Sequence, residues 1–171
     1  MAKAFFAAGY QVQTFPVFGS ERRGAPVEAY LRLDKEEKIL VRSNVYTPDH
    51  VVVQDLRLLD LLDVTHGLKA GGWILLNAPE PPKDLKRFAG FRLAWVDAAR
   101  IALSHKLGSV TQPIVNTAIM GAFARIMGCP PLDAVTAAII DEMPHKKEEN
   151  AAAARDAYEA VRTVETERGK V

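Results

Sequence analysis

The feature that most restricts the fold of this chain is an alternation of short apolar runs with segments of helical periodicity. Residues 51–53 form a continuous β-branched run, residues 73–76 and 91–96 form two further apolar runs, and helical patterns lie between and after them. Runs of this kind are typical of strands that are covered on both faces. Their alternation with helices predicts an α/β fold with a Rossmann-like sheet and flanking helices.

Periodicity and turn residues predict the other elements. Residues 27–33 alternate apolar and polar side chains, which indicates a strand with one buried face, followed by a turn at 34–38 and a hairpin partner at 39–42. Asp97 is placed to cap the helix that follows it. Helices are predicted at residues 2–8, ending at Gly9, and at 56–62, 98–106, 113–128 and 132–143. A final helix over 148–167 has only a thin apolar stripe, so we expect it on the surface or on a partner.

Composition and charge exclude several classes of protein. The 171 residues suit one domain, 1–171, with a C-terminal helix from about residue 147. The 22 basic and 21 acidic residues give a net charge of +1, which argues against nucleic acid as a partner. No apolar run is long enough to cross a membrane, and we expect a cytoplasmic protein. The single Cys129 cannot supply a cluster-binding spacing, so any iron–sulfur centre must lie on another chain.

The most unusual stretch is FPVFGSERRGAPV at residues 15–27, which places Glu21, Arg22 and Arg23 between glycines and prolines instead of on a periodic element. Together with PDHVVVQD at residues 48–55 and NTAIMGAF at residues 116–123, it closely resembles the gamma subunit of pyruvate and related 2-oxoacid:ferredoxin oxidoreductases. The resemblance spans nearly the whole chain. It is closer to enzymes for pyruvate and for branched or aromatic 2-oxoacids than to the 2-oxoglutarate type.

This resemblance implies an accessory role in a complex that converts a 2-oxoacid and coenzyme A to acyl-CoA, carbon dioxide and a reduced acceptor. In the family, the gamma domain is a Rossmann-like layer that packs on thiamine-binding subunits of alpha and beta type, near the approach of coenzyme A. Sister chains, including an iron–sulfur subunit of delta type, hold thiamine diphosphate, Mg²⁺ and the iron–sulfur clusters, and ferredoxin or another acceptor takes the electrons. We therefore expect no cofactor to be held by this chain alone.

The sequence departs from the family at its start. Family members begin with a strand and a glycine-rich turn of the form GRGGQG, whereas this sequence starts inside the helix that follows them. Such a turn lets backbone amides approach a phosphate at a helix N-terminus. Its absence weakens the case for nucleotide or coenzyme A binding, and we expect a partner chain at the sheet edge that a missing strand would expose.

Candidate contacts with coenzyme A lie in the same segment: Gly19, Ser20, Arg22 and Arg23. A guanidinium fork is suited to phosphates and carboxylates, although pairing of Arg22 and Arg23 with acidic residues at an interface is the favoured interpretation. Turn chemistry accounts for Gly19 and Ser20 equally well.

For Asn116, Asp55, the histidines and Cys129, a structural role is favoured over a functional one. Asn116 is a further candidate cofactor contact, but helix capping is favoured for it. Asp55 lies at the carboxyl end of a predicted strand, where α/β sheets bind ligands, yet capping of the helix that follows is favoured for it. The histidines are scattered, and Cys129 has no evident base nearby.

Three functional hypotheses follow. The first is a gamma subunit that completes the shell around a thiamine-dependent site and contacts coenzyme A. The second is a purely structural assembly subunit of the same complex, without ligand contact. The third is a free-standing nucleotide-binding protein, which only fold analogy supports. No arrangement typical of a catalytic triad can be argued from this sequence.

Overall fold

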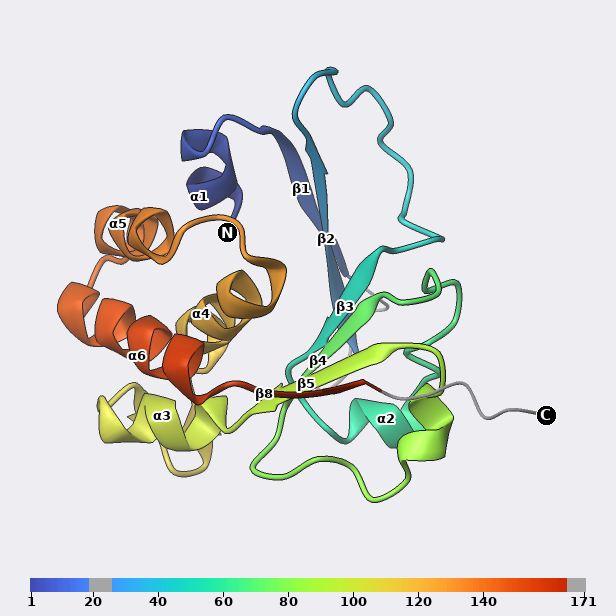
Figure 1. Cartoon of the computed structure of the whole chain (residues 1–171). Helices are drawn as coiled ribbons and strands as arrows, with labels where there is room; N and C mark the ends of the chain where they lie inside the picture. The colour runs from blue at the N-terminus through green and yellow to red at the C-terminus, as the bar shows by residue number, and fades with distance from the viewer. Residues whose placement is uncertain (19–25, 166–171) are drawn as a thin grey trace.

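The computed structural model describes residues 1–18 and 26–165 as a mixed α/β fold, which confirms the predicted fold class (Figure 1). The elements in chain order are α1 (Ala2–Ala7), β1 (Gln11–Phe18), β2 (Val27–Asp34), β3 (His50–Val53), α2 (Leu58–Leu61), β4 (Trp73–Asn77), the 3-10 helix η1 (Leu85–Phe88), β5 (Arg92–Val96), α3 (Ala98–Ser104), β6 (Gly108–Ser109), β7 (Gln112–Pro113), α4 (Asn116–Met127), α5 (Leu132–Glu142), α6 (Lys147–Ala160) and β8 (Arg162–Glu165). Within these residues, no helix combines the length and apolar character needed to cross a membrane.

The main sheet has the strand order β3-β4-β5-β8. β3, β4 and β5 run parallel, and β8 pairs antiparallel with β5. Parallel neighbours require long crossover connections, and these contain α2 between β3 and β4 and η1 between β4 and β5. The carboxyl ends of the three parallel strands therefore meet at one edge, where α/β sheets usually bind ligands.

Helices cover the two faces of this sheet (Figure 1). On one face, α3, α4 and α6 bury the side chains of Leu75, Ala94 and Val96. On the other face, α2 and η1 pack with Ile74, Leu76 and Leu93. A third apolar cluster lies among α1, α4, α5 and α6, away from the sheet. The core is thus a sheet between two layers, extended on one side by further helices.

β3 is less covered than the sequence predicts. Val51 and Val53 face α2, but Val52 points to the opposite face and is 37% exposed. The helices on that face pack over β4 and β5 instead. In the part of the chain that the structure describes, no strand pairs with the outer side of β3. The prediction of burial on both faces is wrong for this strand because it forms the edge of the sheet.

The final helix is not the surface helix that its sequence predicts. α6 buries four alanines, and a Cβ on Gly121 of α4 would lie 1.8 Å from the Ala154 carbonyl oxygen of α6. Only glycine lets the two backbones approach so closely. The alanines form a thin apolar stripe, but their small size allows dense packing between helices. The buried alanines are Ala151, Ala153, Ala154 and Ala157.

One buried hydrogen bond fixes how α4 and α6 are aligned. The Thr117 hydroxyl donates to Asn150 Oδ1 at 2.8 Å, and Asn150 Nδ2 donates to the Lys146 carbonyl at 2.8 Å. Thr117 and Asn150 are both buried. Because an unpaired polar group is costly in such a place, this pair disfavours sliding of one helix along the other.

The chain after α6 also differs from the prediction. The helix ends at Ala160, and residues 162–165 form β8 in place of the predicted continuation to residue 167. The β-branched Thr163 and Val164 suit a strand, and the open side of β5 supplies backbone partners. The Ala-rich residues before Ala160 predict that the helix continues. Pairing with β5 instead makes residues 162–165 a strand.

The strand at residues 27–34 has a different partner from the predicted one. β2 pairs antiparallel with β1, which precedes it, so residues 15–18 of the unusual segment belong to a strand. Residues 39–42 form no strand: the Arg32 guanidinium binds the carbonyl oxygens of Val41, Ser43 and Asn44. The turn at residues 34–38 is confirmed, since Asp34 accepts two backbone amides there.

His50 joins the start of β3 to β4 in its neutral form. The Trp73 amide donates to His50 Nδ1 at 3.1 Å, which requires that this nitrogen carry no proton. Burial lowers the pKa of His50 below its ordinary value of 6.5. The neutral imidazole is therefore part of the folded structure at the edge of the sheet.

Enlarging Gly121 tests the close contact between α4 and α6. Gly121→Ala should lower the free energy of unfolding by about 1–3 kcal/mol, because overpacking forces the two backbones apart. Urea denaturation would measure this, with the exposed Glu148→Ala as a control expected to stay near the wild type. Equal stability of Gly121→Ala and wild type would contradict the packing described.

His50 should make the stability of the protein depend on pH. Its folded-state pKa is lowered, so the unfolded chain binds the proton more readily, and stability rises with pH. The contribution of His50 to the free energy of unfolding is complete above pH 6.5, and it is lost as the pH falls through the lowered pKa of the folded state. We expect the stability difference between wild type and His50→Gln, followed by urea denaturation, to shrink on acidification. A difference that is constant with pH would refute this assignment.

Candidate functional site

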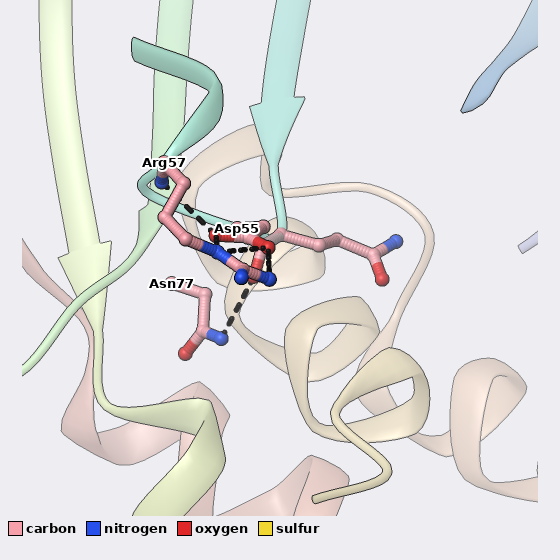
Figure 2. A network of polar contacts seen from close by, with 4 residues as sticks. Asp55, Arg57 and Asn77 are labelled. Carbon is pink, nitrogen blue, oxygen red and sulfur yellow. Dashed lines mark hydrogen bonds and ion pairs between the residues drawn. The ribbon is translucent and has the colours of Figure 1, made fainter. Parts of the chain in front are cut away.

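Polar side chains gather where the parallel strands end, at the edge where this fold class binds ligands (Figure 2). Asp55 follows β3, Asn77 ends β4, and Asp97 follows β5. Arg57 and Arg100 stand close to the two aspartates. We call Asp55, Arg57, Asn77, Asp97 and Arg100 the carboxyl-end cluster.

The carboxylate of Asp55 is already bound by its own neighbour. Arg57 Nε donates to both Asp55 oxygens at 3.0 Å, and Arg57 Nη2 donates to Oδ2 at 2.5 Å (Figure 2). The Arg57 guanidinium, followed by the Arg57 amide, holds the pKa of Asp55 below its ordinary value. The Arg57 amide donates to Asp55 Oδ1 in the turn before α2, but the N-cap of α2 is Arg57 and no side chain caps it, so the predicted capping by Asp55 is wrong. Asp55 is thus a poor candidate for a general base.

Asn77 ties three elements together. Its Nδ2 donates to the Gln54 carbonyl at 3.0 Å, which fixes the end of β3 to the end of β4 (Figure 2). Its Oδ1 accepts the Ala99 amide of α3 at 3.3 Å. The apolar run at residues 73–76 does not by itself single out Asn77 as a functional residue. The signal that could have identified it is its position as a polar residue at the end of an apolar strand.

Asp97 caps α3, as the sequence predicts. Its Oδ1 accepts the Arg100 amide at 2.8 Å, and its other oxygen lies 3.5 Å from Arg100 Nε. Asp97 and Arg100 thereby form a local ion pair. In the carboxyl-end cluster each aspartate is paired with a nearby arginine and Asn77 binds two backbone groups, an arrangement suited to fixing the shape of this edge.

A hollow of about 270 Å³ opens beside Asp97, between the end of β5, α3 and the junction of α6 with β8. Arg100 and Arg162 line it together with Asp97 and Glu159, so its charges balance. Trp95 also lines this hollow, and its buried indole nitrogen has no hydrogen-bond partner among the described residues.

Four predicted contact residues, Gly19, Ser20, Arg22 and Arg23, lie outside the described residues. Asn116 is the first residue of α4, is exposed, and accepts the Thr117 amide at 2.9 Å. The structure therefore does not bring Asn116 into the carboxyl-end cluster.

The remaining chemistry-bearing residues are dispersed. The Cys129 thiol donates to the Tyr10 hydroxyl at 3.5 Å, and His105 Nε2 lies 2.7 Å from Asp156 Oδ2, where it links α3 to α6. Within residues 1–18 and 26–165, no three His, Cys, Asp or Glu side chains come together to suit a metal ion.

Comparison with known proteins finds a matching family model and relatives whose names agree with it. The family model for pyruvate ferredoxin/flavodoxin oxidoreductase matches residues 1–160. Pyruvate synthase subunit PorC of Methanocaldococcus jannaschii is 45% identical, over 92% of this chain and 84% of the relative. The pyruvate/ketoisovalerate oxidoreductases common subunit gamma of Pyrococcus abyssi is 43% identical, over 96% of this chain and 89% of the relative.

A solved structure agrees with these relatives. The crystal structure of the pyruvate oxidoreductase subunit PORC of Thermotoga maritima matches with a TM-score of 0.77 and 34% identity, over 96% of this chain and 87% of that one.

Asn77 provides a test of how the carboxyl-end cluster is built. Asn77→Ala removes two hydrogen bonds between elements and should lower the free energy of unfolding by about 1–2 kcal/mol. The matched Asn116→Ala removes one local bond on an exposed residue and should cost about 0.5 kcal/mol or less. Denaturant titration of both variants would compare them, and equal losses would contradict a special role for Asn77.

The family model covers most of the chain, and the relatives agree with it in sequence and in fold. The chain therefore belongs to the pyruvate ferredoxin/flavodoxin oxidoreductase family, as one of its gamma subunits.

Proposed function

We propose that this chain completes the shell around the active site of a thiamine-dependent 2-oxoacid oxidoreductase without supplying a reactive group. Its relatives are named as subunits of pyruvate and pyruvate/ketoisovalerate oxidoreductases, which supports a 2-oxoacid as substrate. Within the complex, sister subunits of alpha, beta and delta type hold thiamine diphosphate, Mg²⁺ and the iron–sulfur clusters. Ferredoxin or another acceptor takes the electrons, and the proposal places the complex in the cytoplasm.

The observation that carries this proposal is that the carboxyl-end cluster is internally satisfied. Asp55 is bound by Arg57, Asp97 by Arg100, and Asn77 by two backbone groups. Groups that are occupied in this way can fix a surface and exclude water, but they are poorly placed to transfer protons. Thiamine diphosphate would supply the chemistry of decarboxylation from another subunit.

Contact with coenzyme A is assigned in this proposal to the segment at residues 19–25. Arg22 and Arg23 would bind phosphate oxygens through their guanidinium groups, and Gly19 and Ser20 would offer an amide and a hydroxyl. Asn116 is a further candidate, since its side-chain NH₂ has no partner among the described residues.

A purely structural assembly subunit is the second candidate function. The mutual pairing within the carboxyl-end cluster favours it, because these residues have a complete explanation in the fold. In that case, Arg22 and Arg23 would pair with acidic side chains at an interface.

Replacing both arginines in the assembled complex separates the two functions. Arg22→Ala with Arg23→Ala should raise the KM for coenzyme A about tenfold, because one charge-assisted hydrogen bond contributes about 1.5–3 kcal/mol. The thiamine diphosphate content and subunit composition should stay unchanged. Arg155→Ala, on an exposed part of α6, is the matched control and should leave the KM as it is. An unchanged KM in the double variant would leave only the structural function.

A further inference from the structure

We draw no further inference here: the strongest candidate, the hollow between the end of β5, α3 and the junction of α6 with β8, belongs through Asp97 and Arg100 to the carboxyl-end cluster already described, and nothing in the structure shows what would occupy it.

Discussion

The close approach of α4 and α6 at Gly121 and Ala154 is the constraint on which the rest of the architecture depends. With no side chain at Gly121, the two backbones meet, and the small alanines of α6 fill the seam. The buried bond between Thr117 and Asn150 then sets their alignment. Because α6 is held in this position, the chain emerges beside β5 and pairs with it as β8, which completes the sheet. A surface helix could not direct the chain in this way.

The carboxyl edge of the sheet is held together by polar contacts between neighbouring residues, not by close helix packing. Three parallel strands end together there, and each is followed by a polar residue that binds a near neighbour in the chain or the next strand. Such pairing gives a rigid edge with little net charge. It supports the proposal that this subunit shapes a site and leaves acid–base chemistry, metals and redox centres to other chains.

Much of the fold was predictable because it depends on local signals. The order β3, α2, β4, β5 and α3, the Asp97 cap and the turn at Asp34 follow from periodicity and side-chain hydrogen bonding. The errors share one cause. The partner of β2, the exposure of Val52 and the strand after Ala160 all depend on which distant segment lies alongside, and no local pattern records that.

The sequence by itself determined the family, through FPVFGSERRGAPV and its companion motifs, and the α/β class, through the alternation of apolar runs and helices. It also indicated that one face of β2 needs covering. Only the tertiary structure decided that β2 pairs with β1, that Asn77 links two strands to α3, and that the alanines of α6 are central. The physical reason is that local side-chain pattern fixes what each segment can bury, whereas contacts between distant segments decide what it does bury.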